Sequence, residues 1–382
     1  MKRIPLAVRL SLLITACLVS ACPTFGQVAD DRRITIAAPA DVESKRKALI
    51  EFIWGAEGIP RDRLPKVEKD DLSPIAGLEH LRRIDTLVIE MEVGQTGFAH
   101  HFIAKNANGR LVIVHHGHAN TFADGPALDS GYGLQRTING LLKHGFSVLA
   151  VYMPGQVKFK TRVTGKPSSD PPLSHDQMFD RLHVEHGSVL KFFLEPVAVC
   201  VHYLQTRSVE DDFPKYEDFS MIGLSGGGWT TTLYAAIDPQ IRLSIPVAGT
   251  IPLYLRFDGS VGDREQTLPA FYRICGYPDL YVLGSCGAGR RHIQILNRRD
   301  DCCFGEKEHD PQHASGLNFD DAVRGYERDV QQSLKAINGD GSFSVIIDEK
   351  AAGHMISWPA FTDTILPALQ QPAAPTAQQN RQ

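Results

Sequence analysis

The chain has 382 residues, of which 43% are apolar and 22% charged, and a formal net charge of −4. This length and apolar share are sufficient for one large hydrophobic core or two modest ones. The charge is mildly acidic and the sequence contains no long basic block, which argues against a nucleic-acid partner.

Residues 1–26 have the layout of a secretory signal. Basic residues at the start precede an apolar run from Leu10 to Val19, which is too short to span a bilayer. The sequence Val-Ser-Ala-Cys ending at Cys22 resembles a bacterial lipobox, in which Cys22 would be lipidated after cleavage; ordinary cleavage near residue 26 is the alternative. We therefore expect an exported protein, periplasmic or extracellular, that is either soluble or tethered to a membrane through Cys22.

Residues 28–83 are polar, contain several prolines and predict an irregular N-terminal arm with one short helix at 43–53. Strands are expected at 86–91 and 99–104, and the turn sequence at 106–109 leads into the next strand.

From residue 110 onward, apolar runs alternate with helical patterns. Continuous apolar runs are typical of strands that are buried on both faces. The predicted strands are 110–115, 146–152, 218–224, 241–247, 292–296 and 343–348. The predicted helices are 134–143, 189–206, 229–237, 319–337 and 358–369. This alternation predicts an α/β fold in which one mostly parallel sheet has helices on both faces.

Two long segments interrupt the alternation. Residues 156–187 are rich in Pro, Ser and His, and residues 251–291 are rich in Gly, Cys and Tyr. Insertions of this length are often lids, so we expect both to shape a binding pocket. The low-complexity tail, residues 371–382, is expected to be disordered.

The sequence Gly-Leu-Ser-Gly-Gly at 223–227 places Ser225 between a predicted strand and a predicted helix. This pattern is typical of a nucleophilic serine on a turn so tight that only glycine fits beside it. The start of the following helix would direct backbone N–H groups at the reacting oxygen. The alternative interpretation is a glycine-rich turn without chemistry.

A serine nucleophile needs a base, and the base needs an orienting carboxylate. His354 follows the predicted strand 343–348 and precedes the last helix, and Asp300 and Asp301 follow the strand 292–296. The chain order is therefore serine, acid, histidine, which is the order associated with this turn.

These motifs together resemble the α/β-hydrolase superfamily over residues 84–370. The resemblance rests on HHGH at 115–118, GLSGG at 223–227, NRRDD at 297–301 and AGH ending at His354. It implies Asp300 as the acid, in preference to Asp301, because the acid in this family commonly stands three residues after a small residue at the strand end.

The same resemblance implies two oxyanion-hole donors. They are the backbone N–H of Gly226 and that of Gly117 or His118. HHGH differs from the HGGG of many lipases, so both Gly117 and His118 remain candidates.

The sequence thus predicts a serine hydrolase, first a carboxylesterase, that needs no metal or organic cofactor and acts on a small-molecule or polymer-borne ester. A peptidase or amidase on the same fold is one alternative. A metal-dependent hydrolase that uses the histidine clusters (His116, His118, His183 and His186) is a second. A catalytically silent binding protein is the third.

The cysteines predict disulfides, because export permits them. Cys275, Cys286, Cys302 and Cys303 are sufficient for two bridges, and a bridge from Cys302 or Cys303 to Cys275 or Cys286 would tie the second insertion to the acid loop. A zinc site from the same four is less favoured, because no CxxC spacing accompanies them. Cys200 lies in a helical pattern and is expected to be a buried thiol.

Overall fold

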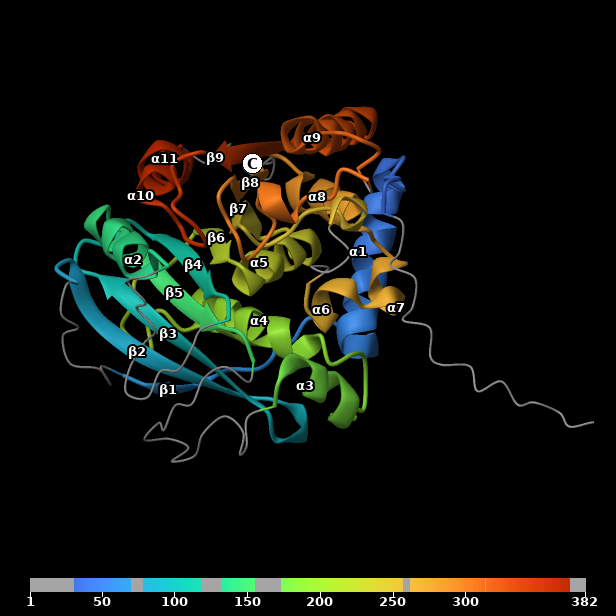
Figure 1. Cartoon of the computed structure of the whole chain (residues 1–382). Coiled ribbons are helices and arrows are strands. Elements are labelled where there is room, and N and C mark those ends of the chain that lie inside the picture. Colours follow the sequence, from blue (N-terminus) through green and yellow to red (C-terminus); the bar gives the residue numbers. More distant parts are fainter. Residues whose placement is uncertain are drawn as a thin grey trace, which may run out of the picture.

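The computed structural model describes residues 31–69, 78–118, 132–154, 173–256, 262–312 and 314–371 (Figure 1). The predicted signal segment with Cys22, the first insertion up to residue 172, and the tail from residue 372 lie outside the described residues. Among the described helices, none is long and apolar enough to cross a membrane.

Within the described residues, nine strands form one sheet in the order β1-β2-β3-β5-β4-β6-β7-β8-β9. Pairing is antiparallel from β1 to β5 and parallel from β5 to β9. The strands are β1 (Lys66–Glu68), β2 (Leu81–Glu90), β3 (Thr96–Ala104), β4 (Arg110–His116), β5 (Ser147–Tyr152), β6 (Asp218–Leu224), β7 (Ile241–Val247), β8 (Arg291–Asn297) and β9 (Ser342–Asp348).

Helices cover both faces of this sheet (Figure 1). They are α1 (Pro39–Trp54), α2 (Leu134–Lys143), α3 (His175–Arg181), α4 (Lys191–Thr206), α5 (Gly226–Ile237), α6 (Arg264–Thr267), α7 (Pro269–Tyr272), α8 (Tyr277–Ser285), α9 (Phe319–Ala336), α10 (Trp358–Ala360) and α11 (Leu366–Gln370). Short turns of other helix types are η1 (Gly55–Glu57), η2 (Glu92–Gly94), η3 (Leu253–Leu255), η4 (Glu306–Glu308) and the π-helical turn η5 (Phe361–Ile365).

The alternation of side chains along β4 explains why a hydrophobic core lies on each face of the sheet. Leu111 and Ile113 belong to the core that the sheet forms with α1, α4, α5, α8 and α9. Val112 and Val114 point the other way, into the core shared with α2 and the C-terminal helices. Both sets are buried, as the continuous apolar run predicts.

Two segments differ from their predictions. The described part of the segment 251–291 is largely helical, because it contains η3, α6, α7 and α8. Every residue of α8 is buried, and α8 packs on α5, so this helix belongs to the core layer and is not a lid. The predicted N-terminal arm also joins the body: β1 pairs with β2, and Arg46 of α1 donates from Nε to the Ala236 carbonyl at 3.1 Å.

The sheet brings the candidate site together. In parallel strands the carboxyl ends meet at one edge, and ligands bind beside that edge. Gly117 follows β4, Ser225 follows β6, Asp300 follows β8 and His354 follows β9. Residues far apart in the sequence therefore line one pocket.

Candidate active site

Ser225 lies at the turn between β6 and α5 in a strained conformation. Its φ is 59° and its ψ is −128°, a region that a residue with a side chain rarely adopts. Its N–H donates to the Val247 carbonyl of β7 at 3.0 Å, which fixes the turn. The strain is therefore held by the neighbouring strand and presents the serine at the end of the sheet.

The glycines beside Ser225 are required by close backbone contacts. A Cβ on Gly223 would lie 2.0 Å from the Gly227 carbonyl oxygen, and one on Gly227 would lie 2.1 Å from the His115 carbonyl oxygen. No side chain fits at such distances. The glycine pattern thus has a physical cause in how β4, β6 and α5 pack.

The backbone of Gly117 lies against the first turn of α5. A Cβ on Gly117 would lie 2.8 Å from the Ser225 Cβ and 3.1 Å from the Gly226 nitrogen. The helix start carries unpaired N–H groups and a positive partial charge. This position is suited to stabilise an oxyanion that forms next to Ser225.

Asp300 and His354 form a hydrogen-bonded pair. Asp300 Oδ2 accepts from His354 Nδ1 at 2.8 Å, and its Oδ1 accepts the N–H groups of Cys302 and Cys303, both at 2.9 Å. Asp300 is fully buried, whereas Asp301 is exposed. Asp300 is therefore the carboxylate that orients the imidazole.

Asn297, at the end of β8, holds the loop that carries His354. Its Nδ2 donates to the carbonyls of Gly353 at 3.0 Å and Met355 at 2.8 Å, on the two sides of the histidine. The small residue three positions before Asp300 thus fixes the backbone on both sides of His354.

The surroundings of His354 raise its pKa above the ordinary value of 6.5. Burial alone would lower the pKa, but the hydrogen bond and the charge of Asp300 outweigh it, with smaller contributions from Cys302 and Asp301. The carboxylate thus favours the imidazolium form, which is the form that a general base produces when it takes a proton.

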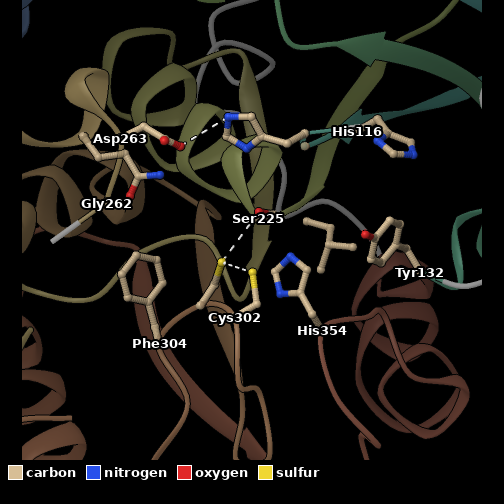
Figure 2. A pocket seen from close by; sticks show the side chains of 13 residues that line it. His116, Tyr132, Ser225, Gly262, Asp263, Cys302, Phe304 and His354 are labelled. Atoms are coloured by element: carbon tan, nitrogen blue, oxygen red, sulfur yellow. Dashed lines mark hydrogen bonds and ion pairs between the residues drawn. The ribbon is translucent and has the colours of Figure 1, made fainter. Parts of the chain in front are cut away.

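Ser225 and His354 line the same cavity, which has a volume of about 430 Å³ (Figure 2). Ser225 Oγ lies 3.9 Å from Cys303 Sγ, within reach of a weak hydrogen bond to the thiol. The sulfur atoms of Cys303 and Cys302 are 2.8 Å apart. Figure 2 shows Ser225 in the centre, His354 and Cys302 on one side of it, and Asp263 opposite them. The lining residues are His116, Gly117, His118, Tyr132, Leu224, Ser225, Gly262, Asp263, Gln266, Cys302, Cys303, Phe304 and His354.

No protein-family model and no curated protein matches the sequence. Solved structures do match. Acetyl xylan esterase 1 from Thermoanaerobacterium sp. JW/SL YS485 has 15% identity and a TM-score of 0.50, over 88% of this chain and 94% of that chain. The chain described in Figure 1 therefore has the α/β-hydrolase fold. An acetyl xylan esterase from Paenibacillus sp. R4 matches with a TM-score of 0.48 and 13% identity, over 88% of this chain and 96% of that one.

The α/β-hydrolase fold confirms the predicted fold class, a mostly parallel sheet between helices. One fold hosts many activities, so the chemistry has to be argued from the site. Of the predicted site residues, the fold brings Ser225, Gly117, Gly226 and the Asp300–His354 pair to one place.

The four histidines of the rival metal hypothesis do not meet on this fold. His116 is buried and stacks on Tyr152 with ring centroids 6.2 Å apart. His183 and His186 are exposed and lie after the end of α3, outside any helix. His118 turns away from all three toward His175, with ring centroids 4.7 Å apart.

The expected disulfides are absent: the five cysteines of the described residues are free thiols. Cys275 is buried beside Lys45 and Asp279, while Cys302 and Cys303 line the pocket with Ser225. The predicted bridge from Cys302 or Cys303 to Cys275 or Cys286 is therefore wrong. Cys200 is a buried thiol, as expected.

Several residues that line the pocket were not predicted from the sequence, namely Tyr132, Gln266, Phe304 and, as parts of the pocket wall, Cys302 and Cys303. The adjacency of Cys302 and Cys303 to Asp300 was the one available signal. Tyr132 and Gln266 come from segments with no motif, so only the fold places them at the site.

Proposed function

We propose that the protein is a serine hydrolase that cleaves carboxylic esters. The observation that carries this proposal is the combination of a strained Ser225 with a buried Asp300–His354 pair in one cavity. Strain at a glycine-bounded serine is costly and is typical of a functional position.

Ser225 Oγ attacks the ester carbonyl while His354 Nε2 takes its proton. This step requires Ser225 to exchange its contact with the Cys303 thiol for one with His354. Asp300 keeps the Nδ1 proton on His354 and stabilises the imidazolium. The Gly226 N–H and the N–H of Gly117 or His118 bind the oxyanion.

His354 then protonates the leaving alcohol, and an acyl group remains on Ser225. Water attacks this acyl-enzyme by the same path, with His354 again as the base, and the carboxylic acid leaves. A cavity of about 430 Å³ is suited to a small acyl group, carried by a small molecule or projecting from a polymer.

The signal-like N-terminus supports export, with the enzyme either soluble or tethered through Cys22. The mass of the mature N-terminal peptide tests this. A lipidated Cys22 at the new terminus would establish the tether, and a terminus near residue 27 would establish a soluble form.

The test of the activity is hydrolysis of 4-nitrophenyl acetate by the purified chain and by Ser225→Ala. We expect the variant to lose at least about a thousandfold in kcat, since it removes the nucleophile. Ser220→Ala, in β6 before the turn, is the matched control and should remain active. Activity that persists in Ser225→Ala would refute the proposal.

A further inference from the structure

Two histidines and two carboxylates converge beside the active-site pocket. His118 follows β4 after Gly117, His175 begins α3, and Asp263 and Glu265 lie at the start of α6. One coordinating atom of each side chain lies within 4.8 Å of the others. Three separate segments of the chain therefore meet at one point.

The contacts within this group have the spacing of metal ligands. His118 Nε2 is 3.2 Å from His175 Nδ1 and 3.2 Å from Asp263 Oδ2, and His175 Nδ1 is 3.0 Å from Glu265 Oε1. Four ligands placed tetrahedrally around Zn²⁺ at their usual bond lengths are about 3.3 Å apart. The three distances match that spacing.

Hydrogen bonds alone do not satisfy every contact of this arrangement. If each ring donates its proton to its carboxylate, two N–H groups oppose each other at 3.2 Å. If His118 Nε2 instead accepts from His175 Nδ1, its lone pair faces the Asp263 carboxylate at 3.2 Å. A cation at the centre would accept all four lone pairs instead.

The carboxylate of Glu265 is a second, independent indication. Glu265 is fully buried, and its Oε2 has no hydrogen-bond partner among the described residues. A buried carboxylate is costly unless it is paired or bound to a metal. The adjacent His175 is itself 6% exposed, so the inner half of the group is shielded from water.

We propose that His118, His175, Asp263 and Glu265 bind one divalent transition-metal ion, Zn²⁺ in the first place. Two imidazoles and two carboxylates are ligands that Zn²⁺ accepts. Four protein ligands close the coordination sphere, which is typical of a structural ion and not of one that activates water. The ion would fasten α3 and α6 to the loop that carries Gly117, and so hold the oxyanion wall of the pocket.

A second group, Cys302, Cys303 and His354, also has metal-ligand spacing. It differs in its chemistry, because two of its three ligands are thiols. Cobalt(II) distinguishes the groups: thiolate ligands give an intense charge-transfer band in the near ultraviolet, while nitrogen and oxygen ligands give only weak visible bands.

The test uses the full chain after dialysis against a chelator. Zn²⁺ is titrated by calorimetry, and Co²⁺ is titrated by absorption. We expect one ion per chain, no thiolate band, and a melting temperature that rises when Zn²⁺ is added. Glu265→Gln, which keeps the side-chain shape, should weaken binding by at least about tenfold and remove the thermal shift. Asp263→Asn is the second variant, in case Glu265→Gln fails to fold.

Two controls complete the design. His183→Ala removes an exposed histidine outside the group and should bind as the wild type does. The double variant Cys302→Ser, Cys303→Ser should also keep the ion. Absence of Zn²⁺ binding at micromolar concentration, or binding that survives in Glu265→Gln and Asp263→Asn, would overturn the proposal. A thiolate band that disappears in the double cysteine variant would overturn it too, and would place the ion at the cysteine pair. None of these readouts depends on ester hydrolysis.

Discussion

Replacement of Asp300 by Asn should nearly abolish activity through a tautomer change in His354. Asp300 Oδ1 accepts two backbone N–H groups, from Cys302 and Cys303, at 2.9 Å each. In Asp300→Asn the side-chain carbonyl oxygen must stay beside these two N–H groups, so the amide NH₂ faces His354 Nδ1. His354 Nδ1 then has to accept a hydrogen bond from this NH₂, and the ring proton moves to Nε2.

An imidazole with its proton on Nε2 cannot take the proton of Ser225. In a serine protease the same Asp-to-Asn change lowers kcat by about 10⁴-fold, and we expect a loss of about 10³–10⁴-fold, equivalent to about 4–5.4 kcal/mol. The loss of the carboxylate charge also removes the main cause of the raised His354 pKa. The acid limb of the residual activity should therefore move to lower pH than in the wild type.

The assay measures kcat, and the pH dependence of kcat/KM, for 4-nitrophenyl acetate with Asp300→Asn, Asp301→Asn and the wild type. Asp301 is exposed and adjacent, which makes Asp301→Asn the matched control, and it should stay within about threefold of the wild type. A variant Asp300→Asn that keeps more than about a tenth of the wild-type kcat would refute the reasoning, as the tautomer change alone must cost more than this. An equal loss in Asp301→Asn would refute the choice of acid.

Three other outcomes follow from the pocket. In the wild type, kcat/KM should rise with pH through a value above 6.5, because a raised His354 pKa keeps the base protonated to higher pH. A midpoint below 6.5 in the pH profile of kcat/KM would contradict this. Gly117→Ala should lower kcat by about 10²–10³-fold, since the new Cβ would lie 2.8 Å from the Ser225 Cβ. The control Gly325→Ala, at a position with open space around it, should keep the wild-type kcat. Equal kcat values for the two variants would exclude the Gly117 loop from the oxyanion site. The hydrogen bond from Cys303 lowers the pKa of Cys302 to about 7, so iodoacetamide should alkylate Cys302 near neutral pH and inhibit hydrolysis. In Cys302→Ser, the rate of hydrolysis should be nearly the same with and without iodoacetamide. Inhibition that persists in this variant would point to another thiol.

The sequence was sufficient to predict the parallel part of the sheet and the order of the candidate residues, whereas β1 was not predicted and β2 begins at Leu81, before its predicted start at residue 86. Strands β6 and β7 match their predicted bounds because each is a mostly apolar stretch that a glycine-containing turn follows. The predicted serine, acid and histidine depend only on which strand each follows, and parallel strands bring their ends together.

Helix α8 could not be recognised in the same way. All nine of its residues are buried, so it has no polar face and no helical period to detect. The ligand set around His118 could not be predicted, since His175, Asp263 and Glu265 come from segments that share no motif. The sequence predicts His118 as an oxyanion donor or as a metal ligand beside other histidines, and only the fold shows that its ring meets His175.

The most direct test of the serine mechanism is covalent labelling of the full chain with a fluorophosphonate, followed by peptide mass spectrometry. A nucleophilic serine at a strained turn should react once per chain, and the adduct should lie on Ser225. Labelling should disappear in Ser225→Ala and be much slower in Asp300→Asn. A folded, unlabelled wild-type chain, or an adduct on another residue, would contradict the account and leave the glycines around Ser225 as a turn without chemistry.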